Sequence, residues 1–242
     1  QVRPRLQMIF QDPISSLNPR RQVRDIVGEG LHIWAEGSDE EQIRARVNEV
    51  LNAVGIDPMV AANRRPHEFS GGQCQRISIA RAVALEPEIL ICDEPVSALD
   101  VSVQAQILNL LEEMKDRYGL TLVFISHDLS VVRNVSDRVI VMYLGKVCEV
   151  GDVDTLYSVP AHPYTRVLLA SAPEPATTVD ESESAIGDEI PSPINPPSGC
   201  RFRTRCPRAD DRCATEEPVL RAVGDDHFVA CHHPTVAETA GR

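Results

Sequence analysis

The sequence predicts an α/β fold. A helix start at Ser70 leads through one helix into an apolar strand, Glu88 to Cys92, and an amphipathic helix after Asp100 leads into a second buried strand, Thr121 to Ile125. Helices that alternate with short apolar strands are typical of a sheet covered by helices. Since no apolar run reaches about 18 residues, the sequence contains no predicted membrane span.

The stretch from Phe69 to Asp100 contains the motifs on which the interpretation of the rest of the chain depends. Ser70 and Gln73 have the S-x-x-Q spacing of a capping box, in which each side chain satisfies a free backbone N–H group at a helix start. The helix is therefore expected to begin near Gly71. It is expected to end near Glu86, because the following proline disfavours a helical conformation at the residue before it.

Two adjacent carboxylates, Asp93 and Glu94, follow the strand that ends at Cys92. Ligands bind at the carboxyl ends of the strands in open α/β sheets, so these side chains are candidates for a binding or catalytic site. Taken alone, the helix start is more often only a cap, and an acidic pair after a strand is more often a solvated turn. The order of the motifs along the chain decides between these alternatives.

Apolar spacing predicts the remaining elements. Ser126, His127 and Asp128 follow the second strand, where a single histidine is more often structural than catalytic. A turn at Leu144-Gly145 joins two strands into a hairpin. Further strands are expected over Arg5 to Phe10, Arg138 to Tyr143 and Lys146 to Val150, and helices over Val23 to Leu31, Glu40 to Val54, Val103 to Met114, Asp154 to Ser158 and His162 to Ala170. Gly119 can end the helix that contains Val103 to Met114.

Charge and composition exclude several function classes. The net charge of −12 and the pI of about 5.0 argue against a protein that holds nucleic acid through phosphate contacts. The first ten residues, QVRPRLQMIF, are too polar for a secretory signal. The chain begins with Gln rather than Met, which indicates a fragment.

The end of the chain is rich in cysteine. Pro, Ser and acidic residues dominate from Pro173 to Ser198, which predicts a linker over residues 171–199. Residues 200–235 then form a predicted metal-binding module with the spacing C-x5-C-x6-C-x17-C. The paired C-x2-C spacing of zinc fingers and ferredoxins is absent. The four cysteines of this module are Cys200, Cys206, Cys213 and Cys231.

A bound metal is the favoured explanation for these four cysteines. They lie among the final 43 residues with few large apolar side chains, so a metal could stabilise a module too small to build a core. Neighbouring arginines are expected to favour the thiolate form. A [4Fe–4S] cluster is preferred and Zn²⁺ is the alternative, with His227, His232 and His233 as candidate substitutes for one ligand. Unrelated buried thiols remain an alternative, and Cys74, Cys92 and Cys148 are interpreted as small core or surface residues.

The joint order of the motifs resembles the ATP-binding subunit of ABC transporters. SGGQ, ICDE and SALD follow one another within 31 residues as the family's signature motif, Walker B strand and D-loop, and Gln11 in MIFQDP resembles the Q-loop. SSLNP, HPYTRVLLASAP and SPINPPSGC resemble the oligopeptide and dipeptide importer branch, and in particular its second ATPase subunit. The resemblance covers about residues 1–235. It implies a P-loop NTPase core over residues 1–170, with a helical subdomain over 12–75 and the signature at 69–73.

The resemblance also implies a role for the candidate site residues. Gln11 would contact Mg²⁺ and the attacking water, Asp93 would orient the Mg²⁺ shell, Glu94 would act as general base, and His127 would contact the γ-phosphate of ATP. The signature residues would serve the nucleotide held by the opposite ATPase subunit, and Ser97 and Asp100 would couple the two sites. These signature residues are Ser70, Gly71, Gly72 and Gln73.

By the same resemblance, the partners are a second ATPase subunit in a heterodimer, two membrane-spanning permease subunits and, indirectly, an extracytoplasmic peptide-binding protein. The location is peripheral, at the cytoplasmic face of the bacterial membrane.

The sequence departs from the pattern of the family in one motif. No G-x-x-x-x-G-K-[ST] phosphate loop occurs in the 242 residues. We therefore expect this chain alone to bind ATP weakly or not at all, and the full-length protein to be a working ATPase. Two alternatives are a soluble ABC ATPase without transport and an ATPase-dead metal-binding interaction module.

Overall fold

The computed structural model describes residues 2–35, 37, 39–171 and 191–235, and its contacts divide the chain into two units, residues 1–127 and 128–242. Most of the predicted linker, residues 172–190, lies outside the described residues. Residues 128–170 pack within the second unit, whereas the sequence groups them with the first. The domain boundaries expected from the sequence stay a prediction.

A parallel sheet forms the centre of the first unit. Its strands are β1 (Leu6–Ile9), β2 (Ile89–Asp93) and β3 (Thr121–Ile125), in the order β1-β2-β3. Leu90 and Cys92 of β2 are fully buried, which explains the apolar run in the sequence. All three strands end at the same edge of the sheet, where Asp93 pairs in register with Ile125. The predicted α/β class and the predicted strand positions are therefore confirmed in this unit.

The prediction that β3 is buried is wrong for one of its faces. Val123 is 45% exposed and Ile125 is 46% exposed, while Leu122 and Phe124 pack against the core. Exposed and covered side chains alternate along β3 because only one of its faces contacts the helices of this unit. Among the described strands, β3 pairs with β2 alone. An apolar run by itself does not reveal which face of a strand is covered.

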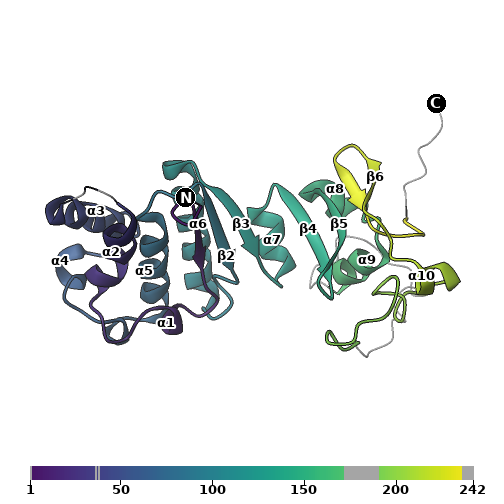
Figure 1. The fold of residues 1–242 in the computed structure, drawn as a ribbon, viewed down its shortest axis with the longest axis horizontal. Coiled ribbons are helices and arrows are strands. Elements are labelled where there is room, and N and C mark those ends of the chain that lie inside the picture. Colours follow the sequence, from purple (N-terminus) through teal and green to yellow (C-terminus); the bar gives the residue numbers. More distant parts are fainter. Residues whose placement is uncertain (1, 36, 38, 172–190, 236–242) are drawn as a thin grey trace. The chain divides into compact units, whose positions relative to one another are not determined.

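Helices in the first unit surround α5 (Gly71–Val83), as Figure 1 shows. One layer lies on the side of α5 away from the sheet, and α6 (Val101–Tyr118) packs beside α5 and ends at the left-handed Gly119, as predicted. The elements of this layer are α2 (Val23–Trp34), α3 (Glu40–Ala53) and α4 (Pro58–Ala61), and the 3₁₀ turn Pro66–Glu68 precedes α5 in the chain.

The predicted capping box begins α5. The backbone N–H of Gln73 donates to Ser70 Oγ at 3.4 Å, and the backbone N–H of Ser70 donates to Gln73 Oε1 at 3.0 Å. The helix ends at Val83 rather than near Glu86, because Glu86 adopts a positive φ of 51° that no α-helix contains. The start of α5 is thus fixed by its own sequence.

A partly buried arginine connects α5 to the short helix α1 (Pro13–Ser16) that follows Gln11. Arg81 Nη1 donates to the carbonyl oxygen of Ser16 at 2.7 Å, and burial lowers the pKa of this guanidinium. Asp12 caps the start of α1 by accepting the N–H groups of Ile14 and Ser15. The loop that carries Gln11 is therefore anchored to the same helix as the SGGQ motif.

An antiparallel sheet organises the second unit, in the order β4-β5-β7-β6. The hairpin of β4 (Arg138–Tyr143) and β5 (Lys146–Asp152) turns at Leu144 and Gly145, both at positive φ, as predicted. The helices of this unit are α7 (Leu129–Val135), α8 (Val153–Ser158), α9 (Pro163–Ala170) and α10 (Asp211–Thr215).

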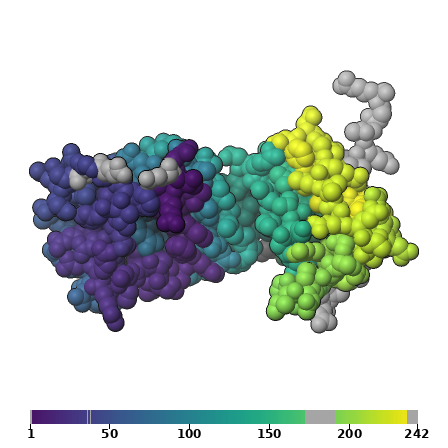
Figure 2. Space-filling view, viewed as in Figure 1, coloured from purple at the N-terminus to yellow at the C-terminus, as the bar shows by residue number. Residues whose placement is uncertain are grey.

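The Cys-rich end of the chain adds two strands to this hairpin. β7 (His227–Val229) pairs with β5, and β6 (Arg221–Gly224) pairs with β7. Figure 2 shows residues 191–235, coloured green to yellow, as a continuous surface within this unit. Inside, the buried carboxylate of Glu149 on β5 accepts hydrogen bonds from the N–H groups of Ala161 and His162 and lies 2.7 Å from His227 Nε2. Because one carboxylate joins β5, β7 and the start of α9, the Cys-rich end is part of the packed second unit.

Candidate active site

The side chains of Gln11, Glu94 and His127 meet at the carboxyl edge of the parallel sheet. Gln11 Nε2 donates a hydrogen bond to Glu94 Oε2 at 2.7 Å, and His127 Nδ1 lies 3.0 Å from Glu94 Oε1. These residues follow β1, β2 and β3 respectively, so three parallel strands deliver one side chain each to the same place. The sequence predicted each position, and the structure brings all three together.

Its neighbours keep the Glu94 carboxyl ionised. The pKa of Glu94 lies below its ordinary value, mainly because His127 forms a hydrogen bond with the carboxylate. Ser97 and Gln11 lower this pKa further by smaller amounts, whereas burial raises it. The Glu94 side chain is 24% exposed and His127 is 72% exposed. A charged carboxylate that is open to solvent can accept a proton from a water molecule.

The backbone at Glu94 is in an uncommon conformation that sequence analysis did not foresee. Its φ of 45° lies in the left-handed region, which non-glycine residues rarely adopt. The N–H of Glu94 donates to the carbonyl oxygen of Ile125 at 3.0 Å, and its own carbonyl oxygen accepts the Ser97 hydroxyl at 3.1 Å. These bonds hold the residue in place, and strain of this kind is concentrated at functional sites.

The other predicted site residues belong to the same unit. Asp93 is the last residue of β2 and is partly buried. Asp100 caps α6, because its side chain accepts the backbone N–H of Val103 at 3.0 Å. Ser70 and Gln73 are exposed at the start of α5, where free N–H groups and the helix dipole favour an anion. The structure gives these two residues no direct contact with Glu94.

The two glycines of the SGGQ motif differ in the space around them. A Cβ at Gly72 would lie 2.6 Å from Val103 Cγ1 of α6, whereas a Cβ at Gly71 would meet only Leu99 Cδ2 at 3.9 Å. Gly72 therefore lets α5 approach the start of α6, which Asp100 caps. This contact connects the SGGQ and SALD motifs through the packing of two helices.

We predict that Gly72→Ala destabilises the protein by about 1 to 3 kcal/mol, because valine is branched at Cβ and cannot easily turn away. The second substitution Val103→Ala should restore most of this loss by removing the contacting methyl groups. Gly71→Ala is the matched control and should have little effect on unfolding. Chemical denaturation of the wild type and these three variants measures this, and a Gly72→Ala protein as stable as the wild type would contradict the packing described.

The four C-terminal cysteines also come together, in the second unit. A charge on Cys200 raises the pKa of Cys206, Cys213 and Cys231, and similar effects link the remaining pairs. The backbone N–H of Cys200 donates to the carbonyl oxygen of Cys213 at 2.8 Å. Burial raises the pKa of the nearby Cys148 thiol to about 12, and charges on Cys200 and Cys231 contribute to the same shift.

The expectation that arginines favour the thiolate form is wrong for the metal-free protein. Burial raises the pKa of each of the four thiols, that of Cys231 to about 11, and the arginine charges near Cys200 and Cys206 only partly oppose this effect. Desolvation outweighs the arginine charges, because removal from water disfavours the charged form of each thiol. A metal would therefore have to displace protons from these thiols.

Comparison with known proteins identifies the family. The family description "ABC transporter" matches residues 1–97, and "Oligopeptide/dipeptide transporter, C-terminal region" matches residues 148–213. The oligopeptide transport ATP-binding protein OppF of Escherichia coli K12 is 52% identical over 232 residues, which are 95% of this chain and 69% of OppF. The chain belongs to the family of ABC transporter ATP-binding proteins.

Further matches agree with this family. OppF of Salmonella typhimurium is 51% identical over 96% of this chain and 69% of its own length. The solved structure of cbiO1 from Clostridium perfringens, part of the ABC transporter complex cbiONQ, matches 64% of this chain and 60% of its own with 32% identity and a TM-score of 0.57. The predicted ABC ATPase fold and the importer branch are confirmed. Among the described residues, no helix is both long and apolar enough to cross a membrane.

Proposed function

We propose that the full-length protein couples ATP hydrolysis to the uptake of oligopeptides or dipeptides as an ATPase subunit of an importer. The observation that carries the chemical part is the ionised carboxylate of Glu94, held between Gln11 and His127 at the ligand-binding edge of a parallel sheet. The substrate class is supported by relatives named as oligopeptide transport proteins.

In this proposal Glu94 is the general base. Its carboxylate accepts a proton from the water that attacks the γ-phosphate, while Gln11 orients that water and His127 contacts the γ-phosphate. The amide of Gln11 and the imidazole of His127 both donate to Glu94 in the absence of nucleotide. ATP can therefore contact Gln11 and His127 only if their hydrogen bonds to Glu94 break or are shared with the nucleotide.

The same edge of the sheet suits a magnesium ion. Asp93 ends β2 and Gln11 follows the neighbouring strand β1 by two residues, and they offer carboxylate and amide oxygens, which are the hard ligands that Mg²⁺ prefers. When bound, Mg²⁺ would neutralise charge that develops on the phosphate oxygens. Asp93 is our proposed residue for orienting its shell, and Gln11 would join it from β1.

The SGGQ motif would act on a different nucleotide. Ser70 and Gln73 are exposed at the start of α5 and, with Gly71 and Gly72, would bind the ATP held by a second ATPase subunit. Ser97 and Asp100 would link the two sites. The proposed assembly also contains two permease subunits and, outside the membrane, a peptide-binding protein, with this subunit peripheral at the cytoplasmic face.

Stimulation by peptide tests the transport function. The full-length protein is assembled with its second ATPase subunit and permease subunits in liposomes, and ATP hydrolysis is measured with and without the peptide-loaded binding protein. We expect hydrolysis to rise with peptide and not with sugars or free amino acids. Hydrolysis that no peptide changes would contradict import and favour a soluble ABC ATPase, whereas no hydrolysis at all would favour an ATPase-dead module.

We further propose a [4Fe–4S] cluster on Cys200, Cys206, Cys213 and Cys231. The proposal is supported by the mutual effects of these four thiols, since a charge on one raises the pKa of another. Among described residues, no three of these sulfurs lie mutually within 4.8 Å, whereas Zn–S bonds of about 2.3 Å hold four sulfurs roughly 3.8 Å apart. The wider spacing suits a cluster better than one zinc ion. Such a cluster would stabilise the end of the chain.

Metal analysis of anaerobically purified protein tests this cofactor. We expect about four iron and four sulfide ions per chain and an absorption band near roughly 400 nm. Cys206→Ser should lower the iron content, and Cys74→Ser, which changes a buried thiol of the first unit, is the matched control. Stoichiometric zinc with no iron, or iron that does not depend on Cys206, would contradict the cluster.

A further inference from the structure

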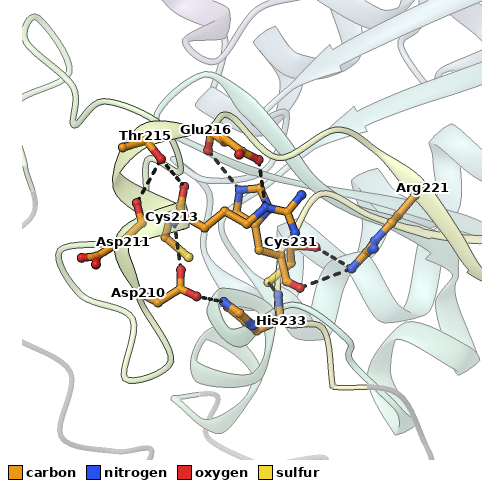
Figure 3. A network of polar contacts seen from close by, with 10 residues as sticks. Asp210, Asp211, Cys213, Thr215, Glu216, Arg221, Cys231 and His233 are labelled. Carbon is orange, nitrogen blue, oxygen red and sulfur yellow. Dashed lines mark hydrogen bonds and ion pairs between the residues drawn. The ribbon is translucent and has the colours of Figure 1, made fainter.

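A carboxylate, a thiol and an imidazole gather at the start of α10. One ligand atom each from Asp210, Cys213 and His233 lies within 4.8 Å of the other two, and Figure 3 shows these side chains facing one another. Among the described residues, this is the only group of three or more His, Cys, Asp or Glu side chains that is so compact. The site lies beside the four cysteines and shares Cys213 with them.

The backbone orients the carboxylate of this group. Asp210 Oδ1 accepts the backbone N–H of Cys213 at 3.0 Å and so caps α10, which leaves Oδ2 facing His233 Nε2 at 2.9 Å. A carboxylate with one oxygen fixed by a helix cap presents the other in a constant direction. Hydrogen bonds of this kind, made by the atom that does not bind the metal, orient metal ligands in proteins.

Hydrogen bonds also fix the backbone at and just before His233. The backbone N–H of His233 donates to Cys231 Sγ at 3.3 Å, and Arg221 Nη2 donates to the carbonyl oxygen of Cys231 at 3.0 Å. The neighbouring His232 turns away, since its Nε2 lies 3.0 Å from the carbonyl oxygen of Glu216. Only one of the two adjacent histidines therefore points at Asp210 and Cys213.

We propose that Asp210, Cys213 and His233 bind a single divalent ion of the zinc class, at a site distinct from the four-thiol site. The donors are carboxylate oxygen, thiolate sulfur and imidazole nitrogen, which is the ligand set that Zn²⁺ accepts. On binding, Cys213 releases its proton to solvent and His233 offers the lone pair of Nε2 with the proton on Nδ1. Three protein ligands leave a fourth tetrahedral position for water.

Because Cys213 belongs to both sites, one molecule holds either the single ion or the full cluster. This second step rests on the proposed [4Fe–4S] cofactor, whereas the single-ion site does not. A divalent ion bound first would block cluster assembly by occupying one of its four thiolates. The C-terminal module would then differ in metal content according to which metal reached it first.

Cobalt titration tests the single-ion site. Co²⁺ is added under anaerobic conditions to the full chain after removal of bound metal, and the thiolate-to-cobalt absorption band is followed. We expect about one Co²⁺ per chain, displaced by Zn²⁺. His233→Ala and Asp210→Asn should each weaken Co²⁺ binding by at least about 10-fold, and His232→Ala is the matched control with unchanged affinity.

A second set of variants separates this site from the cluster. Cys206→Ser should reduce iron and sulfide but keep Co²⁺ binding, His233→Ala should do the reverse, and Cys213→Ser should lose both. Thermal unfolding of each variant checks that the fold is retained. Co²⁺ binding that survives His233→Ala, or that falls equally with Cys206→Ser, would overturn the single-ion site. Failure of the wild-type chain to load iron would overturn the cluster and the competition, but not the Co²⁺ result.

Discussion

Replacing Glu94 with glutamine is expected to lower ATP hydrolysis by the assembled transporter about 100-fold or more. The amide keeps the shape of the side chain but cannot take a proton from water. Gln11 and His127, which donate hydrogen bonds to the carboxylate, stay in the protein and can still position a nucleotide. Release of phosphate by wild-type and variant complexes measures the effect, and binding of ATP should remain.

The matched control for this prediction lies near the other end of the same strand. Glu88 immediately precedes β2, is exposed and pairs with Arg5, far along the strand from Glu94. Glu88→Gln should leave hydrolysis close to the wild-type rate. If Glu94→Gln hydrolysed ATP as fast as this control, the carboxylate would not be the base and the proposed chemistry would fail.

Gly199→Ala is expected to disrupt the Cys-rich end of the chain. Gly199 has a φ of 61°, and an added Cβ would collide with the carbonyl oxygen of Cys213 and lie 2.9 Å from the carbonyl carbon of Ala214. Both neighbours are backbone atoms that cannot rotate away. We expect a loss of about 3 kcal/mol or more in the free energy of unfolding. The bond between Cys200 N–H and Cys213 O should be lost with it.

Gly119→Ala separates the steric effect from the backbone effect. Gly119 has nearly the same φ, 63°, but a Cβ there would meet nothing within 4 Å. Its substitution should cost only about 1 to 2 kcal/mol, from the left-handed backbone alone. Chemical denaturation and iron content of both variants provide the measurement. Equal losses in the two variants would show that the contact at Gly199 does not matter.

Local signals were strong enough to predict the first unit. The capping box at Ser70 begins α5 where expected, Gly119 ends α6 as expected, and the strand before Asp93 and Glu94 is β2. Each of these features depends on residues close together in the sequence. The partly exposed face of β3 was missed, because coverage of a strand depends on neighbours that its own sequence does not specify.

The strands of the Cys-rich end could not be predicted either. β6 and β7 have four and three residues, and β6 is mostly exposed, so neither shows an apolar pattern. They form because β7 pairs with β5 and because His227 reaches the buried carboxylate of Glu149. Contacts between residues 78 positions apart leave no local signal.

The candidate site was predicted in composition but not in geometry. The positions of Gln11, Glu94 and His127 followed from motifs at three strand ends, whereas their hydrogen bonds needed the fold. The positive φ of Glu94 is invisible in a sequence, since glutamate does not mark the left-handed conformation as glycine does. Asp210 was missed because its partners are a helix cap and a distant histidine.

Uptake of labelled peptide tests the central claim most directly. Liposomes that contain equal amounts of the assembled transporter, with wild-type or Glu94→Gln subunit, are loaded with ATP on the side that faces this subunit, and accumulation of peptide is followed. We predict accumulation that requires ATP with the wild type and none above background with the variant. Equal accumulation by both, or accumulation without ATP, would contradict the account.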